Sequence, residues 1–451
     1  MLIASFFILT VVFIYAIIKN HGTYKSVLWY LLGLLLLNAH ISPIDFLVHI
    51  GAHILLTYSL LGSVLLNFLL RRKKTIKFPF RGSLLIVLFG VFVVGLMDGR
   101  LGLASRFSYP IREFFENYIC IFLGFYAIRD EEDIKRLRGL LLFGVVVIST
   151  YGIFNLMTKS NPYYELVADT YLSKDNSSVI AALDERNNRY RAASTFSRTF
   201  DFGYFSALLS FIFLYFLQAI RRSNVLNYTM IGLCIVGMIL SNSRTVLLAF
   251  SAGFLIYFMT AISIGSKIKY FFLIFVVIVI SNLTIPAVSE SFKNTFAAVT
   301  GEETEVQGSS VDMRREQLLG TIRYWSDSPI IGNGYGFILN ELGWADKKNL
   351  DEQMRGFESI VFQLLIEQGL VGLITKFYLF ISILIYFSRN LSRYRLLAGT
   401  GLSILILFLI FALGTGPLGS IPITMTILGI IIKTIELKKY QLRKSLTSIQ
   451  P

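Results

Sequence analysis

The sequence predicts an all-α polytopic membrane protein with about 12–13 transmembrane helices and a large extracytoplasmic loop that contains amphipathic helices. Hydrophobic residues make up 55% of its 451 residues, charged residues make up 16%, and the mean hydropathy is +0.65. Apolar stretches recur along the chain, close in length to the roughly 20 residues that a helix needs to cross a bilayer. Lysine and arginine gather in the short segments between these stretches, as is typical of cytoplasmic loops.

The first apolar stretch begins directly after Met1. Residues 2–18 lack the basic region and the small-residue cleavage site of a signal peptide, so we expect them to remain as a helix. The candidate spans cover approximately residues 2–18, 26–39, 44–70, 82–97, 109–128, 139–158, 201–220, 225–241, 245–264, 270–287, 358–387, 397–414 and 419–436.

Basic loops set the expected orientation of the chain. "RRKK" at 71–74, "KRLR" at 135–138 and "KKYQLRK" at 438–444 are placed in the cytoplasm by the positive-inside rule. The two long polar segments then lie on the other face. The expected division is N-terminal transmembrane helices (1–158), first extracytoplasmic loop (159–200), central transmembrane helices (201–287), large extracytoplasmic loop (288–357), C-terminal transmembrane helices (358–436) and basic cytoplasmic tail (437–451).

The net charge of +14 does not indicate nucleic acid, because the basic residues are dispersed among the spans. We expect the lipid bilayer as a partner and no nucleic acid. Motifs of nucleotide-driven pumps, zinc proteases and nucleotide-sugar transferases are absent from the sequence, and we expect neither a cofactor nor a metal. His49 and His53 have metal-ligand spacing, but a polar contact in the bundle is the preferred interpretation without a third ligand nearby. Arg112 and Glu116, one turn apart, are expected to pair.

The large extracytoplasmic loop has internal order. "SSVD" at 309–312 is typical of a helix start, Pro329 ends the apolar pattern, and "GNGYG" at 332–336 predicts a glycine turn. We therefore expect an amphipathic helix lying across the outer mouth of the bundle. The apolar residues that recur at helical spacing are Leu318, Leu319, Ile322 and Trp325.

Glu358 stands at the start of the span that contains Lys376, where an ionisable residue needs an explanation. If residues 358–376 form one straight helix, Gly369 and Lys376 share the face of Glu358, and Glu367 lies on the opposite side. A face with small residues suits the close approach of another helix or an isoprenoid chain. Glu358 is then either a catalytic or binding carboxylate or a cap at the helix N-terminus, where the macrodipole favours an anion.

Five arginines are candidate anion ligands. Arg244 in "SNSR" lies at the expected outer boundary, where it can snorkel, pair or hold an anion. Arg191 and Arg198 stand in "RYRAASTFSRTFDFGYF", and crowded guanidiniums repel one another unless an anion lies between them. Arg314 and Arg315 begin the loop helix and point to different faces. A guanidinium binds phosphate oxygens bidentately, so these residues suit a lipid diphosphate, with separate solvated charges as the alternative.

Four stretches stand in a fixed order over residues 191–374: "RAASTFSRTFDFGYF", "MILSNSRTVLLAF", "RREQLLGTIRYWSDSPIIGNGYG" and "ESIVFQLLIEQGLVGLI". Together they resemble the bacterial O-antigen polymerase and O-antigen ligase superfamily of integral membrane glycosyltransferases. The resemblance implies action at the outer face of the cytoplasmic membrane on glycans carried by undecaprenyl diphosphate. It places Arg191, Arg244 and Arg314 or Arg315 in the basic elements of the superfamily.

The last motif favours one branch of this superfamily. The ligase branch has a histidine where the motif begins, whereas this chain has Glu358, as in the polymerase branch. Its four histidines, at positions 21, 40, 49 and 53, lie far away in sequence.

The residues and the resemblance together predict a metal-independent polymerase that joins undecaprenyl-diphosphate-linked oligosaccharide repeat units into a surface polysaccharide (O-antigen, capsule or exopolysaccharide). Donor and acceptor are both lipid-linked, and a chain-length regulator is a further expected partner. The expected location is the bacterial cytoplasmic (inner) membrane, with the active site facing the periplasm or exterior. Two alternatives stay open: a ligase that moves finished glycan to a lipid or protein acceptor, and a lipid-linked glycan transporter or flippase.

The chemistry assigns a role to each candidate residue. Glu358 is the expected general base, which accepts the proton of the acceptor hydroxyl. The arginines stabilise negative charge on the departing diphosphate. The expected diphosphate- or glycan-binding residues are Arg191, Arg198, Arg244, Arg314 and Arg315.

Overall fold

A computed structural model of the chain describes residues 2–21, 23–38, 40–42, 51–70, 76–171, 185–186, 189–220, 224–262, 310–342, 359–415 and 420–447. The N-terminal elements are α1 (Leu2–Lys19), α2 (Tyr24–Leu36), α3 (Ala52–Leu70), α4 (Arg81–Met97), α5 (Leu103–Glu113), the π-helix η1 (Phe114–Tyr118), α6 (Cys120–Ala127), α7 (Glu131–Thr158) and α8 (Pro162–Tyr171). The later elements are β1 (Glu185–Arg186), β2 (Arg189–Tyr190), α10 (Thr199–Ala219), α11 (Asn224–Leu240), α12 (Arg244–Thr260), α15 (Ser310–Asp327), α16 (Phe337–Asn340), α17 (Ile360–Asn390), α18 (Arg395–Gly414) and α19 (Ser420–Thr447). The two short strands pair antiparallel.

The predicted all-α polytopic membrane fold is confirmed. Six helices of the described chain are long and apolar enough to cross a membrane: α3, α7, α10, α17, α18 and α19. Five shorter apolar helices, α1, α2, α4, α11 and α12, coincide with further predicted spans. The expected span at 109–128 is built from α5, η1 and α6 in succession. The expected span at 270–287 lies outside the described residues.

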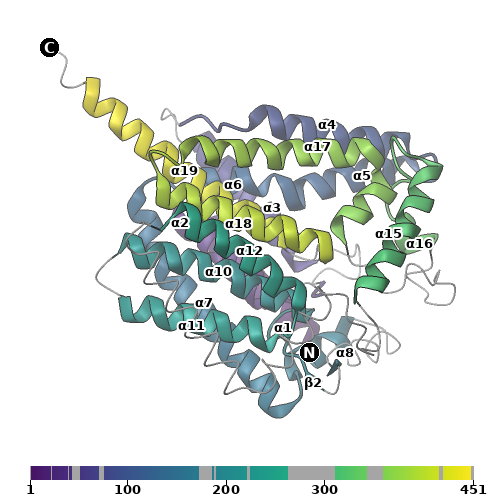
Figure 1. Ribbon diagram of the computed structural model, residues 1–451, viewed down its shortest axis with the longest axis horizontal. Helices are drawn as coiled ribbons and strands as arrows, with labels where there is room; N and C mark the ends of the chain where they lie inside the picture. Colours follow the sequence, from purple (N-terminus) through teal and green to yellow (C-terminus); the bar gives the residue numbers. More distant parts are fainter. Residues whose placement is uncertain are drawn as a thin grey trace.

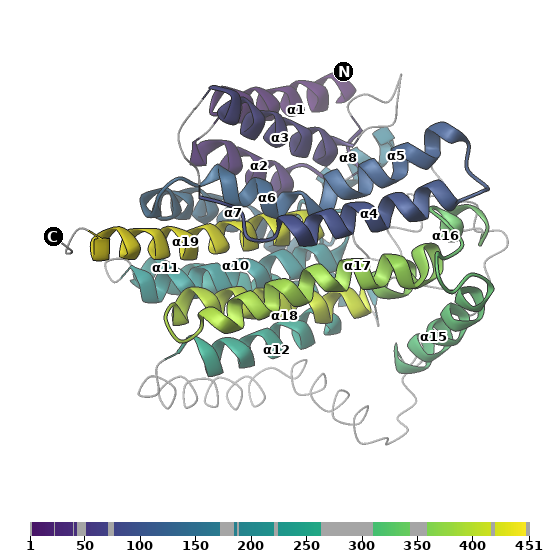
Figure 2. The ribbon, with the colours of Figure 1, turned by 90° about the horizontal axis from the view of Figure 1, so that it is seen from above.

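The helices run back and forth between two ends of one bundle (Figure 1, Figure 2). At one end, the Arg395 guanidinium donates to the carbonyl oxygens of Thr260 at 2.6 Å and Ile262 at 2.7 Å, which joins the start of α18 to the end of α12. We call this the basic end, because the last turns of α19 with Lys438 also lie there, paired with Glu131 at 4.0 Å. The opposite end, where α18 stops and α15 lies, is called the site end.

Close helix crossings hold the bundle together. A Cβ atom at Gly124 in α6 would overlap the carbonyl of Thr426 in α19, and one at Gly429 would overlap the carbonyl of Ile121. Small residues at such crossings let backbones touch, which is the usual source of helix association inside a bilayer.

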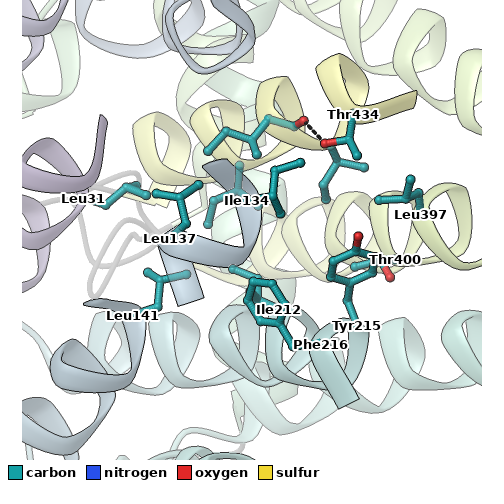
Figure 3. Close-up of a pocket in the computed structure, with 13 residues that line it drawn as sticks. Leu31, Ile134, Leu137, Leu141, Ile212, Tyr215, Phe216, Leu397, Thr400 and Thr434 are labelled. Atoms are coloured by element: carbon teal, nitrogen blue, oxygen red, sulfur yellow. Dashed lines mark hydrogen bonds between the residues drawn. The ribbon is translucent and has the colours of Figure 1, made fainter. Parts of the chain in front are cut away.

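An apolar pocket lies near the basic end, between α2, α7, α10, α18 and α19 (Figure 3). Ile134 and Leu137 line it from the first turns of α7, and Leu397 from the first turn of α18. The lining residues that the structure describes are uncharged. The arginines of the predicted motifs lie at the other end of the bundle, where Arg314 contacts the end of α18.

Candidate functional site at the end of helix α18

The segment that links β2 to α10 contains the first sequence motif and is fixed by buried hydrogen bonds. The Ser194 hydroxyl donates to the carbonyl of Ile148 in α7, and the Thr195 hydroxyl to that of Leu35 in α2, both at 2.6 Å. The Ala192 amide donates to the carbonyl of the last residue of α11 at 3.1 Å. Side-chain bonds to backbone thus replace regular secondary structure here.

Arg191 anchors this segment to the end of α11. Its side chain is buried, and its Nε donates to the carbonyl of Ser241 at 3.2 Å. The guanidinium also lies 4.9 Å from the centre of the Phe200 ring. A cation is favoured at the carbonyl end of a helix and over an aromatic face. These contacts fix the turn that leads from α11 to Arg244.

That turn presents Arg244 at the start of α12. Asn242 adopts a left-handed conformation with φ of 44°, which asparagine tolerates better than most residues. The Ser243 hydroxyl caps α12 by accepting from the Val246 amide at 3.4 Å. Arg244 follows with an exposed side chain. It therefore stands at a helix N-terminus, which itself favours anions.

Arg314 attaches α15 to the end of α18. Its Nη1 donates to Gln317 Oε1 at 2.7 Å, and its Nη2 donates to the carbonyl of Gly414 at 2.5 Å. Arg315 is exposed. The prediction that the two arginines face different ways is confirmed, and Arg314 is the one that faces the bundle.

The start of α17 meets the same end of α18. The Ile360 amide donates to the carbonyl of Thr415 at 3.2 Å, and the Ser359 hydroxyl donates to that of Ala412 at 3.4 Å. Glu358, the predicted general base, precedes Ser359 directly but lies outside the described residues. The chain therefore enters α17 next to Gly414 and Thr415.

The end of α18 is the meeting point of the predicted motifs. Gly414 accepts from Arg314 and also contacts the residue after Arg244, since a Cβ atom at Gly414 would lie 2.6 Å from Thr245 Cγ2. Helices α12 and α17 both begin here, and the backbone N–H groups of their first turns add positive potential. Arg198 lies at the same end of the bundle, at the N-cap of α10. Positively charged side chains and helix N-termini therefore gather at this end of the bundle, an arrangement that favours anions.

α15 lies across the site end as predicted (Figure 1). Its bundle-facing side is polar, because Gln317 and Thr321 are buried, while Leu318 and Ile322 are 42% and 48% exposed. The amphipathic helix thus directs polar side chains inward, towards α17 and α18, and apolar ones outward.

The prediction of one straight helix from 358 to 376 is wrong. Gly369 has non-helical angles, φ 58° and ψ −155°, and breaks α17 into an outer half, Ile360–Gln368, and an inner half, Leu370–Asn390. The loop after α15 fills the break. Its Gly334 amide donates to the carbonyl of Glu367 at 2.9 Å, and its Ile330 carbonyl accepts from Val371 at 2.9 Å. Backbone groups released by the break are therefore satisfied by the loop.

Sequence reasoning missed a buried polar cluster beside this break. Lys376 is fully buried and pairs with Glu113 of α5 at 2.5 Å between Nζ and Oε1. Glu367 is buried nearby, accepting from the Ile338 amide at 3.3 Å and from Gln363 at 3.1 Å. A lysine in an apolar span requires a carboxylate partner, which was the available signal. Helical periodicity alone could not indicate which glutamate pairs with Lys376.

Two secondary predictions are tested by the described contacts. Arg112 and Glu116 pair as expected, with Nε donating to Oε1 at 2.6 Å. His53 makes a polar contact within the bundle, donating from Nε2 to the carbonyl of Leu37 at 2.8 Å. His49 lies outside the described residues.

His40 lies beyond the end of α2, and Arg198 influences it electrostatically. Burial, then the positive charge of Arg198, lowers the pKa of His40 from 6.5 to about 4. Because the unfolded chain binds this proton at higher pH than the folded chain, the stability contributed by neutral His40 is complete above pH 6.5 and is lost as pH falls towards about 4. We expect His40→Gln to weaken the acid-induced fall in the thermal unfolding midpoint. An unchanged pH dependence would contradict this assignment.

The fold and this arrangement define a multi-pass membrane protein with a cationic site at one end of its helices. A family model described as O-Antigen ligase matches residues 229–377, about a third of the chain. This match contains the motifs of Arg244, Arg314 and the start of α17, and it confirms the resemblance to the O-antigen polymerase and ligase superfamily of glycosyltransferase-like membrane enzymes. No curated protein matches the chain.

Proposed function

We propose that the chain is a polymerase that joins undecaprenyl-diphosphate-linked oligosaccharide repeat units at the outer face of the bacterial cytoplasmic membrane. The observation that supports this most strongly is the meeting of Arg314, the Arg244 turn and the start of α17 at Gly414 and Thr415. Residues that are far apart in sequence are thereby gathered where a lipid-linked substrate arrives from the bilayer.

The proposed reaction needs a base and a cationic cradle. Glu358 accepts the proton of the acceptor hydroxyl as the new glycosidic bond forms to the anomeric carbon of the donor. The bond from that carbon to the diphosphate oxygen breaks, and undecaprenyl diphosphate leaves. Arg244 and Arg314 stabilise the charge that develops on the leaving group, together with the positive ends of the dipoles of α12 and α17. In this proposal no metal ion takes part.

The direct test is an elongation assay. Purified protein in nanodiscs would be given lipid-linked oligosaccharide. The oligosaccharide would be extracted from the native bacterium after deletion of the gene for this protein, so that single repeat units accumulate. A ladder of products that differ by one repeat unit supports the polymerase. A single longer product with a lipid acceptor supports the ligase, which is the second candidate because the matching family does not distinguish it from a polymerase. Flux of lipid-linked glycan across proteoliposomes without any change in glycan length supports a transporter and excludes both enzymes.

The neighbouring arginines of α15 provide a matched pair of variants. Arg314 faces the end of α18, whereas Arg315 is exposed on the same helical turn. We expect Arg314→Ala to lower the elongation rate by roughly 10²-fold, the usual loss when a charge-stabilising donor is removed. We expect Arg315→Ala to change the rate by less than about threefold, because Arg315 points to a different face of α15 from Arg314, which contacts the end of α18. Equal losses in the two variants would contradict the placement of the diphosphate beside α18.

A further inference from the structure

The Glu113 carboxylate accepts hydrogen bonds from residues in three separate parts of the chain. Its Oε1 accepts from Lys376 Nζ at 2.5 Å, and both its oxygens accept from Gln368 Nε2 at 3.1 and 3.0 Å. Its Oε2 accepts from the Tyr335 hydroxyl at 2.6 Å. Lys376 Nζ also donates to Gln368 Oε1. The carboxylate is therefore the shared acceptor of a connected polar network.

The donors belong to elements that carry the candidate site. Gln368 ends the outer half of α17, whose other end begins beside Thr415. Tyr335 lies in the loop that follows α15, the helix that holds Arg314. Lys376 belongs to the inner half of α17, which packs against α4 so closely that a Cβ atom at Gly90 would meet the Thr375 side chain. Glu113 thus joins two external elements to the transmembrane helices.

Each external element is attached near both of its ends, in addition to the backbone bonds between the loop and the break in α17. The outer half of α17 runs about 12 Å from the end of α18 to the carboxylate, at 1.5 Å per residue. α15 is attached to the end of α18 through Arg314, and its following loop is attached to Glu113 through Tyr335. Two points of attachment fix the direction of an element, whereas one point allows it to pivot. Reacting groups displaced by about 1 Å can lose 10²-fold in rate.

We propose that Glu113 is a positioning residue, which orients the outer half of α17 and the helix α15 so that the start of α17 and Arg314 face the same substrate. This inference rests on the proposed function. It adds a residue from a part of the chain that the family match does not include.

Tyr335 gives the mildest variant for a test. Burial, then the nearby Glu113 carboxylate, raises the pKa of Tyr335 well above its ordinary value, so the phenol stays protonated and donates. Its ring stacks on Tyr109 with centres 5.9 Å apart. Tyr335→Phe keeps the stacked ring and removes only the hydroxyl, which donates to Glu113 at 2.6 Å and also lies 3.4 Å from the Val91 carbonyl oxygen. Glu113→Gln instead leaves Lys376 without its carboxylate, so Glu113→Gln with Lys376→Met removes both charges together.

The experiment combines kinetics with hydrogen exchange in nanodiscs. We expect Tyr335→Phe, Glu113→Gln and the double variant to lower kcat for elongation by about tenfold or more, with KM for the lipid-linked donor changed less than about twofold. Exchange should rise in peptides that cover 329–336 and 364–372, where the loop and the break in α17 share hydrogen bonds, and stay unchanged in α10 and α18. Glu116→Gln is the matched control, because Glu116 pairs with Arg112 on the same helical segment.

Three outcomes in the variants would overturn the proposal. Loss of elongation activity without increased hydrogen exchange in these two peptides would show that Glu113 does not hold the loop and the outer half of α17. Increased exchange throughout the chain would show a general structural role, and increased local exchange with normal elongation would show that the attachment does not position the site. A wild-type protein that elongates no lipid-linked glycan would refute the proposed function instead, while the exchange comparison would still report on the attachment.

Discussion

Glu358→Gln is expected to reduce the rate of chain elongation by about 10²- to 10⁴-fold, the contribution of a positioned general base. Glutamine matches glutamate in size but cannot accept the proton of the acceptor hydroxyl. Because Arg244 and Arg314 remain, KM for the lipid-linked donor should change little. Initial rates of ladder formation at several donor concentrations measure both quantities.

This variant also separates the two interpretations of Glu358. The alternative that Glu358 itself caps α17 is wrong, because the N-cap is Ser359, whose hydroxyl accepts from the Phe362 amide at 3.3 Å. If Glu358 acted only on the dipole of α17 from the position before that cap, the elongation rate would stay within a few-fold of wild type, and the thermal unfolding midpoint would fall slightly. Glu341→Gln is the matched control, since Glu341 is an exposed carboxylate in the same external segment, after α16. A ladder that forms at the wild-type rate with Glu358→Gln would remove Glu358 from the chemistry.

The transmembrane helices were predictable because their signal is local. A helix that crosses a bilayer must be apolar over its own length, so composition within each window is sufficient. α10 and α18 match their predicted spans within a few residues. Helix α15 was predictable for the same reason, since its start, its period and the following Pro329 are neighbours in sequence.

The arginine-containing motifs were also found locally, but their partners were not. Arg191 and Arg314 donate to main-chain carbonyls of Ser241 and Gly414, and a carbonyl has no signature in the sequence. The sequence did not predict the ion pair between Lys376 and Glu113, for a different reason. Glu113 and Lys376 come from α5 and α17, and their pairing depends on how those helices pack. Long-range packing of this kind leaves no periodic pattern in one sequence.

Gly369→Ala is expected to disrupt the contact between α17 and the loop that follows α15. Alanine adopts a φ near 58° only with strain, and its Cβ would lie 2.5 Å from the Gly332 nitrogen and 2.6 Å from the Ile330 oxygen. These are backbone atoms, which cannot rotate away. Strain and overpacking together should destabilise the docked loop by about 2–5 kcal/mol. Because the loop binds the backbone groups at the break in α17, we expect this destabilisation to separate the loop from the helix.

Thiol labelling can detect that separation. Ile338 of α16 is buried against Ile366 of α17. Both native cysteines are buried, so a cysteine placed at position 338 reports on this contact. We expect Gly369→Ala to speed its reaction with a membrane-impermeant maleimide by more than about tenfold, because each 1.4 kcal/mol of lost docking energy raises the open population tenfold. Gly232→Ala in α11 is the matched control. It also replaces a glycine in a helix by alanine, but the added Cβ meets open space. Equal labelling rates in the two variants would show that the loop does not depend on the glycine break.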